Sequence, residues 1–489
     1  MDLIKSSFSE IKNAIKEKKI SAKEVTQFFL SRIQSHDKKI NSFITINDKA
    51  LDEANVIDQK ISRGEDAGLL GGVPFGIKDM LCTRGLRTTA GSKILNNFIP
   101  PYDATVVERL KKSGVVVLGK TNQDEFAMGS SNETSFYGVV KNPWNLECVP
   151  GGSSGGSAAA QSARFTAGTI GTDTGGSIRQ PASFCGIVGV KPTYGRVSRY
   201  GIVAYASSLD QAGPMVSSVE DAALTLEVIC GKDEKDATTS SKTVPAFTKN
   251  LRKDLKGFRI GVMKEFMSDA LDKDVQLTVE QALDAAKKLG AEIIEVSVPL
   301  TSQAVPMYYL VAASEASSNL ARYDGVKYGH RSEFKDLSSI DLDQFYSKTR
   351  GQGFGSEVQR RIMLGTYCLS AGYYEAYYNK ACQVRRLLKN QYEDAFKKCD
   401  VILSAVTTHP AFKIGDRISD PLAMYLNDIF TVSTNLAGLP GLSLPFGKAH
   451  SGLPIGVQLT AGPFEEQKML DVAYALENVS SVKGALPNV

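Results

Sequence analysis

The stretch 258-FRIGVMKEFMSDALDKDVQLTVEQALDAAKKLGAEIIEVSV-298 indicates the fold class, because its hydrophobic pattern changes twice along its length. Residues 258–263 and 292–298 are short apolar runs typical of buried strands, and residues 274–289 have the spacing of an amphipathic helix that ends at Gly290. A strand, a helix and a second strand at this spacing predict a right-handed βαβ unit with parallel strands.

Elsewhere in the chain, other short apolar runs are expected to be strands, at residues 115–118, 187–190, 401–406, 441–446 and 454–459. Two helices are predicted within residues 1–36, the second opened by a capping box of Ser21 and Glu24. Ser217 and Glu220 form a second such pattern before another helix, and a last helix is expected at 464–478. We therefore predict an α/β protein of one domain, in which a large mixed, partly parallel sheet is flanked by helices.

Charge, cysteine content and the lack of long apolar runs argue against nucleic-acid binding, a metal site and insertion into a membrane. The chain has 57 Lys and Arg against 53 Asp and Glu, and a net charge of +4 is too small for an electrostatic nucleic-acid footprint. The seven cysteines form no CxxC pair and predict reduced thiols, and no ligand cluster implies a metal site. The lysine-rich N-terminus lacks a signal-peptide core and no run of 18 apolar residues occurs, so the expected location is the cytoplasm, or an organellar matrix, away from membranes.

The string 114-GVVVLGKT-121 matches a phosphate-binding loop letter for letter, and a nucleotide-binding function has to be weighed. In such a loop the variable positions must curl so that their N–H groups face the phosphates. Here they are Val115, Val116, Val117 and Leu118, which favour a strand. We therefore predict a buried strand with a turn at Gly119.

Two Gly/Ser stretches, 150-PGGSSGGSAAA-160 and 171-GTDTGGSIRQPASFCG-186, are better placed to carry chemistry. Their backbones can approach a ligand closely, and Ser177 follows a glycine pair as a nucleophile beside its own oxyanion hole would. A serine needs a base, but none of the four histidines lies near these stretches in sequence: His36, His330, His409 and His450. His409, in 407-TTHP-410, is interpreted as a structural loop residue.

Lysine is the remaining candidate for the base, and 71-GGVPFGIKDM-80 places Lys78 in an apolar segment. A solvated lysine is neutral in only about one molecule in 2,500 at pH 7, so the mechanism requires burial of the amine. The alternative is a surface Lys78 paired with Asp79, with the Gly/Ser stretches acting only as turns. Spacing alone leaves both interpretations open.

The three segments FGIKD, PGGSSGGSAAA and GTDTGGSIRQPASFCG, in this order, resemble the amidase signature family, which implies a Ser-Ser-Lys triad. Carried over by motif, Lys78 is the buried base, Ser153 the serine at a cis peptide that relays protons, and Ser177 the nucleophile; Ser154 is the alternative relay. Backbone N–H groups of Thr174, Gly175, Gly176 and Ser177 are expected to hold the oxyanion. Asp173 and Arg179 are interpreted as scaffold that supports this loop.

Further stretches, at residues 121–138, 312–329, 351–378 and 425–445, are similar to the glutaminase subunits of tRNA-dependent amidotransferases within this family. The resemblance implies a chain that hydrolyses glutamine and binds no cofactor of its own. It also implies two further subunits, a small one and one that uses ATP and Mg²⁺ to amidate misacylated Glu-tRNA(Gln), or Asp-tRNA(Asn), with the released ammonia. This chain would then meet tRNA only indirectly.

The resemblance also implies where glutamine is recognised. Arg361 in 359-QRRI-362 corresponds to the cation for the α-carboxylate, and Asp428 in 426-LND-428 to the anion for the α-ammonium. Arg360 is the rejected neighbour, because adjacent residues of a helix point about 100° apart. Tyr309 is preferred over Tyr308 as a further contact, whereas the run 373-YYEAYY-378 is expected to pack as helix.

With the motifs assigned, residues 1–489 are expected to form one amidase domain. Its parts are N-terminal helices at 1–60, a core with the triad at 60–220, an exposed connector at 231–250, and the rest of the sheet with the recognition region at 251–489. The alternatives are a stand-alone amidase of the same family, a nucleotide-binding protein built on residues 114–121, and an inactive scaffold.

Overall fold

The computed structural model describes residues 1–266, 271–336, 340–417, 424 and 427–489. An 11-stranded sheet runs through this part of the chain in the order β1-β3-β2-β4-β6-β5-β10-β11-β9-β7-β8. Its strands are β1 (Phe43–Ile46), β2 (Pro74–Lys78), β3 (Val116–Thr121), β4 (Gly168–Asp173), β5 (Val188–Lys191), β6 (Gln211–Val216), β7 (Arg259–Met263), β8 (Glu292–Val296), β9 (Val401–Ala405), β10 (Gly441–Lys448) and β11 (Pro454–Ala461).

The sheet is mixed, with parallel pairing towards each end. Strand β2 is parallel to both β3 and β4, and β7 is parallel to both β8 and β9. The pairs between these two groups, and the edge pair of β1 with β3, are antiparallel. The predicted fold class, a large mixed and partly parallel sheet flanked by helices, is confirmed.

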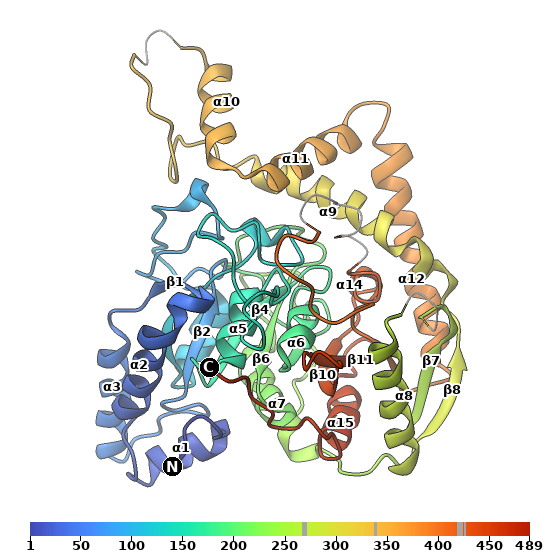
Figure 1. Ribbon diagram of the computed structural model, residues 1–489. Coiled ribbons are helices and arrows are strands. Elements are labelled where there is room, and N and C mark those ends of the chain that lie inside the picture. Colours follow the sequence, from blue (N-terminus) through green and yellow to red (C-terminus); the bar gives the residue numbers. More distant parts are fainter. Residues whose placement is uncertain (267–270, 337–339, 418–423, 425–426) are drawn as a thin grey trace.

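Helices lie along both ends and over the sheet (Figure 1). They are α1 (Phe8–Lys16), α2 (Ala22–Ile40), α3 (Ala50–Ser62), α4 (Thr105–Lys112), α5 (Gly155–Ser162), α6 (Arg179–Cys185), α7 (Val219–Ile229), α8 (Lys273–Lys288), α9 (Ala304–Leu320), α10 (Leu342–Gly353), α11 (Ser356–Leu369), α12 (Lys380–Phe396), α14 (Val432–Leu436) and α15 (Glu466–Glu477). Figure 1 shows α1 to α3 gathered at one end of the molecule, α8 with β7 and β8 at the other, and α10 projecting from the body. None of the helices in the described ranges is long and apolar enough to cross a membrane.

The predicted strand–helix–strand unit is present as β7, α8 and β8, with β7 and β8 parallel. The capping box at Ser21 and Glu24 is also present, with both reciprocal hydrogen bonds. The second predicted box is wrong by one residue. Ser218 caps α7 and accepts from the Asp221 N–H, while Ser217 accepts from the Gln161 side chain.

Residues 116–121 form strand β3, which is buried along its whole length. The predicted turn at Gly119 is wrong, because the strand continues through this residue and pairs with β1 and β2. A Cβ at Gly119 would lie 2.3 Å from the Thr45 carbonyl oxygen, so glycine here permits close pairing with β1. The Lys120 ammonium donates to the Leu81 carbonyl at 2.6 Å and to the Thr88 hydroxyl at 2.7 Å. Lys120 is therefore a structural residue inside the sheet.

Helix α6 packs closely against β5, β10 and β11 because these strands carry glycines beneath it. A Cβ at Gly189 would lie 2.6 Å from the Cβ of Ala182, and one at Gly456 would lie 3.0 Å from the Ser183 hydroxyl. Since α6 forms the second half of the Gly/Ser stretch 171–186, this packing fixes the stretch, with Ser177, against the sheet.

The tyrosine-rich run 373–378 differs from the expected helix packing. Part of it forms a π-helical turn, η7 (Glu375–Asn379), in which no residue is buried. The rings pair at helical spacing, with 5.9 Å between the centroids of Tyr373 and Tyr377, but they do so at the surface.

Candidate active site

Parallel pairing of β2 with β4 brings the carboxyl ends of both strands to the same edge of the sheet. Lys78 is the last residue of β2, and Thr172 lies near the end of β4. The Lys78 ammonium nitrogen lies 2.8 Å from the Thr172 hydroxyl, 2.7 Å from the Ser153 hydroxyl and 2.9 Å from the Ser154 hydroxyl. Three neutral oxygens thus surround an amine that is 0% exposed.

Burial favours the neutral form of this amine. It lowers the pKa of Lys78 from 10.5 to about 7, although the carboxylates of Asp124, Asp173 and Asp210 act in the opposite direction. The alternative of a surface pair with Asp79 does not hold. Asp79 is buried too, and its carboxylate accepts from the Thr89 N–H at 2.9 Å and lies 3.9 Å from the Lys120 ammonium.

The two candidate relay serines differ in their partners. Ser153 follows a cis peptide bond, Gly152–Ser153, and its hydroxyl contacts Lys78 directly. The Ser154 hydroxyl also donates to the Thr172 carbonyl at 3.0 Å and accepts from the Thr172 N–H at 3.2 Å, which ties it to the backbone of β4. The Ser154 N–H donates to the Ser177 carbonyl at 3.2 Å, so the two Gly/Ser stretches are in direct contact at the nucleophile.

The loop after β4 is organised by the Asp173 side chain. Its carboxylate accepts from the Gly176 N–H at 2.8 Å and from the Ile178 N–H at 3.2 Å. The inclusion of Gly176 among the oxyanion donors is therefore not supported, because this N–H already has a partner, and Thr174, Gly175 and Ser177 remain as candidates. Gly176 has a φ of +139° and a Cβ there would lie 2.3 Å from the Thr431 hydroxyl, so the position requires glycine.

Arg179 fixes Asp173 in this position. Its guanidinium contacts both carboxylate oxygens of Asp173 at 3.0 Å and donates to the Gln458 side chain at 2.6 Å. Burial alone would raise the pKa of Asp173, but the ion pair and hydrogen bonds outweigh it and lower the pKa to about 2. The two residues act as scaffold, and the charged carboxylate holds the loop.

Helix α11 carries the predicted recognition cation on its buried face. The Arg361 guanidinium donates to the Glu357 carboxylate at 2.8 Å and to the Tyr205 hydroxyl at 2.6 Å. Arg360 pairs with the same glutamate from outside, and half of its side chain is exposed. Gly365 lets α11 lie directly on α9, since a Cβ there would be 2.0 Å from the Ala313 carbonyl oxygen. Figure 1 shows the two helices side by side.

Asp428 is also buried, and the Ser130 hydroxyl donates to its carboxylate at 2.6 Å. Burial raises the pKa of Asp428 to about 7, although the Ser130 bond and the Arg361 charge lower it. A bound ammonium would favour the ionised form and so lower the pKa of Asp428 towards its ordinary value. The motif around it is only partly visible, because residues 425 and 426 lie outside the described ranges.

Both candidate tyrosines come from α9 and lie at the site. The Tyr309 ring centroid is 5.1 Å from the Arg361 guanidinium carbon. Tyr308 instead lies close to Tyr205 and packs on the nucleophile loop, where a Cβ at Gly175 would lie 2.6 Å from its ring. The geometry therefore puts Tyr309 beside the recognition cation and Tyr308 beside the candidate oxyanion donors.

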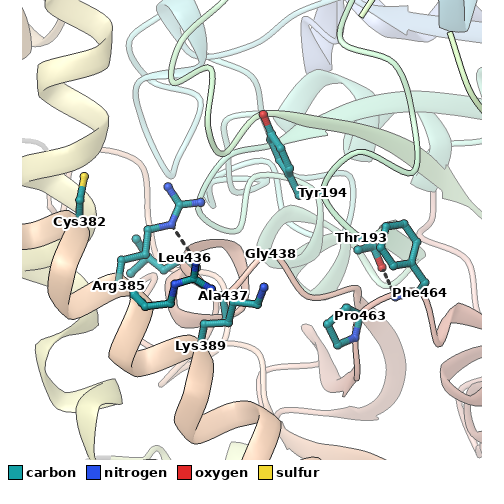
Figure 2. Close-up of a pocket in the computed structure, with 11 residues that line it drawn as sticks. Thr193, Tyr194, Cys382, Arg385, Lys389, Leu436, Ala437, Gly438, Pro463 and Phe464 are labelled. Atoms are coloured by element: carbon teal, nitrogen blue, oxygen red, sulfur yellow. Dashed lines mark hydrogen bonds between the residues drawn. The ribbon is translucent and has the colours of Figure 1, made fainter. Parts of the chain in front are cut away.

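A cavity of about 260 Å³ opens at the recognition end, lined by Glu125, Gly129, Ser130, Ser131, Glu133, Thr134, Gly355, Ser356, Glu357, Arg360, Arg361, Arg417 and Met424. A larger hollow of about 440 Å³ lies elsewhere, between α12 and residues 436–438 (Figure 2). Its Arg385 is bound to the Leu436 carbonyl, and burial raises the pKa of its Cys382 thiol, which disfavours a nucleophilic thiolate. The smaller cavity, which Arg361 lines, is the better candidate site.

His409 has the structural role expected from sequence, with its ring nitrogens 2.8 Å from the Pro410 carbonyl and 2.9 Å from the Asn427 side chain. No group of His, Cys, Asp and Glu side chains in the described ranges could hold a metal ion. All seven cysteines are free thiols, as predicted.

Sequence reasoning missed several residues that build the site. They are Thr172, Ser130, Asp124, Tyr205 and Glu357. The spacing of Glu357 and Arg361, four residues apart on a predicted helix, is the one signal that could have found a member of this group. The others come from distant segments that only the fold brings together.

Known proteins match this chain both in sequence and in structure. The Amidase family profile matches residues 24–470. The A subunit of glutamyl-tRNA(Gln) amidotransferase from Bdellovibrio bacteriovorus is 73% identical over the full length of both chains. The crystal structure of the corresponding A subunit from Thermotoga maritima is 41% identical, with a TM-score of 0.82 over 100% of this chain and 98% of that one. The peptide amidase of Stenotrophomonas maltophilia is 29% identical, with a TM-score of 0.84 over 99% and 98% of the two chains.

Proposed function

The chain belongs to the amidase family, as its motifs predicted, and we propose that it is the glutaminase subunit of a tRNA-dependent amidotransferase. Its similarity over full length to the A subunits of glutamyl-tRNA(Gln) amidotransferases supports this proposal. The observation that carries the chemistry is the fully buried Lys78, whose nitrogen lies 2.7 Å from the Ser153 hydroxyl.

In the acylation step the Ser177 oxygen attacks the side-chain carbonyl carbon of glutamine. The Ser177 proton passes to Ser153, which gives its own proton to neutral Lys78. Backbone N–H groups of the loop at Thr174, Gly175 and Ser177 stabilise the negative oxygen of the tetrahedral intermediate. When the carbon–nitrogen bond breaks, Lys78 returns the proton to the nitrogen through Ser153, so that ammonia leaves and a glutamyl ester remains.

Deacylation repeats the same proton path with water. A water molecule gives a proton through Ser153 to Lys78 as it attacks the ester carbonyl, and the proton returns to the Ser177 oxygen when the ester bond breaks. Glutamate is released and the neutral amine is restored. One lysine therefore acts as base and acid twice in each cycle, which requires a pKa near the working pH.

Recognition of glutamine is assigned to Arg361, which lines the cavity, and to Asp428, which is bound to the cavity residue Ser130. Arg361 binds the α-carboxylate, and its bonds to Glu357 and Tyr205 fix the plane of the guanidinium. Asp428 binds the α-ammonium, with Ser130 holding its carboxylate. The Tyr309 ring lies beside the Arg361 guanidinium.

The released ammonia is passed to a partner in the assembly. In this proposal that partner binds ATP and Mg²⁺ and amidates misacylated Glu-tRNA(Gln), or Asp-tRNA(Asn), and a third, small subunit completes the assembly. The net charge of +4 supports a chain that leaves tRNA binding to its partner.

The decisive experiment traps the acyl-enzyme. The chain is incubated with glutamine and hydroxylamine, quenched, and analysed by mass spectrometry. We expect a glutamyl adduct on the peptide that contains Ser177, together with glutamyl hydroxamate in solution. Ser177→Ala should abolish both products, and an adduct on a different peptide would refute the assignment.

A stand-alone amidase is the second candidate, favoured by the likeness to the peptide amidase. Dependence on partners separates the two. A glutaminase subunit should co-purify with other subunits and should prefer glutamine. Rapid hydrolysis of varied amides by the isolated chain, with no other subunit bound to it, would favour the stand-alone enzyme.

A further inference from the structure

Tyr205 is fully buried beside the site but belongs neither to the triad nor to the recognition pair. Its hydroxyl accepts a hydrogen bond from the Arg361 guanidinium at 2.6 Å. A buried guanidinium that loses such an acceptor is left with an unsatisfied donor. The phenol therefore fixes where the recognition cation lies.

The backbone of Tyr205 is in turn attached to the nucleophile loop. Its N–H donates to the Asp210 carboxylate at 3.0 Å, and the Thr174 hydroxyl donates to the same carboxylate at 2.7 Å. Asp210 is itself buried, so both bonds are shielded from water. Asp210 thus joins the segment that holds Arg361 to the first residue of the loop.

A second connection runs through Tyr308. Its ring packs against Gly175, where a Cβ would lie 2.6 Å away, and its phenol lies close to that of Tyr205. The loop and the phenol of Tyr205 therefore touch the same side chain. Two independent contacts, one polar and one steric, keep Tyr205 at a fixed position relative to the candidate oxyanion donors.

The recognition anion is attached to the same loop from the opposite side. The Thr431 hydroxyl donates to the Gly175 carbonyl at 2.6 Å, and the Thr431 N–H donates to the Asp428 carbonyl at 3.0 Å. Both charged recognition groups are thus held at set distances from the atoms that would surround the scissile amide.

We propose that Tyr205 and Asp210 are positioning residues that set the spacing between Arg361 and the nucleophile loop, and that this spacing selects glutamine over asparagine. The inference rests on the proposed function, because it takes Arg361 as the ligand of the α-carboxylate. Asparagine is one methylene shorter, so its carbonyl falls short of Ser177 when its α-groups are bound. A misplacement of about 1 Å costs on the order of 10²-fold in rate.

The test uses the full chain with the subunits that co-purify with it, and compares hydrolysis of glutamine, of asparagine and of p-nitrophenyl acetate, an ester without α-groups. Tyr205→Phe removes only the hydroxyl. We expect its KM for glutamine to rise about tenfold or more and its preference for glutamine over asparagine to fall by a similar factor. The acyl burst with p-nitrophenyl acetate should fall far less.

Glu357→Gln is the matched control, since it removes the negative charge beside Arg361 but keeps a hydrogen-bond acceptor at the same place on α11. It should weaken both amino-acid amides alike and leave their ratio unchanged. Asp210→Asn should lower the ester burst as well as the glutamine preference, because it loosens the loop itself.

The inference is overturned if Tyr205→Phe keeps the wild-type preference for glutamine, or if it lowers the ester burst and glutamine turnover equally. Failure of the proposed function looks different. In that case the wild-type chain shows no preference for glutamine, and Arg361→Ala leaves its KM unchanged.

Discussion

The pH dependence of glutamine hydrolysis follows from two buried groups. Burial lowers the pKa of Lys78 from 10.5 to about 7, which shifts its protonation equilibrium towards the neutral amine by about 5 kcal/mol relative to a solvated lysine, at 1.36 kcal/mol per tenfold. Only the neutral amine can accept the proton, so activity rises with pH. With glutamine saturating, kcat should reach roughly one tenth of its plateau at pH 6, half at pH 7 and nine tenths at pH 8.

Binding of glutamine to the free enzyme depends on a second ionisation, because Asp428 must be ionised to bind the α-ammonium. Burial raises the pKa of Asp428 to about 7 as well. Below this pH both groups must lose a proton, and kcat/KM should fall to roughly one hundredth of its plateau at pH 6, about tenfold further than kcat. Saturating glutamine removes the second condition, since the bound ammonium keeps the carboxylate ionised.

The measurement is ammonia release between pH 5.5 and 9.5 at constant ionic strength, with kcat and KM fitted at each pH and a return to pH 8 as the control for denaturation. A kcat that continues to rise tenfold per pH unit through pH 9 would indicate a solvated amine and would refute the buried base. A kcat that is flat from pH 6 to 8 would exclude Lys78 as the base altogether.

Five further substitutions follow from the contacts. Ser153→Ala should lower kcat by about 10²- to 10⁴-fold, because it removes the hydroxyl that relays the proton. Ser154→Ala should mainly lower the melting temperature, through loss of a buried hydrogen bond. A larger loss of kcat in Ser154→Ala than in Ser153→Ala would identify Ser154 as the relay. Arg361→Lys should raise the KM for glutamine at least tenfold while Arg360→Lys leaves it near wild type, and equal effects on KM would remove the distinction between them. Lys120→Met should lower the free energy of unfolding by about 3–5 kcal/mol, because it leaves the buried Asp79 carboxylate without its cation. Selective loss of nucleotide binding by a stable variant would contradict this structural role.

The spacing of apolar residues predicted helices that bury one face and strands that are buried on both faces. The unit β7, α8 and β8 and the strands β9, β10 and β11 all have apolar runs that identify them. Strands β4 and β6 were not predicted, because GTIGTD and QAGPMV carry glycine and polar residues inside the sheet. Gly171 shows the cause, since a Cβ there would lie 2.6 Å from the Met215 sulfur. Close packing selects small residues at such positions and removes the hydrophobic signal.

The motifs located the candidate triad, but they could not assign individual hydrogen bonds of the backbone. Gly176 illustrates the limit, because its N–H donates to the Asp173 carboxylate, which the Arg179 guanidinium also binds. The same guanidinium donates to Gln458 of β11, which lies far along the chain. The capping residue of α7 is a smaller case, because the predicted Ser217 accepts from the Gln161 side chain and the next serine, Ser218, caps the helix.

The neutral amine of Lys78 depends on how the carboxylates around it are bound. Asp124, Asp173 and Asp210 all act on the amine in the direction that would keep it protonated. Each carboxylate is instead bound to loop donors: that of Asp173 to Arg179, that of Asp210 to Thr174 and the Tyr205 N–H, and that of Asp124 to Thr134 and the Asn132 N–H. The hydroxyls of Ser153, Ser154 and Thr172 are left as the neighbours of the lysine. The hydrogen bonds that shape the loops are therefore also the ones that keep carboxylates away from the amine, and the base and the loop geometry are built by one network.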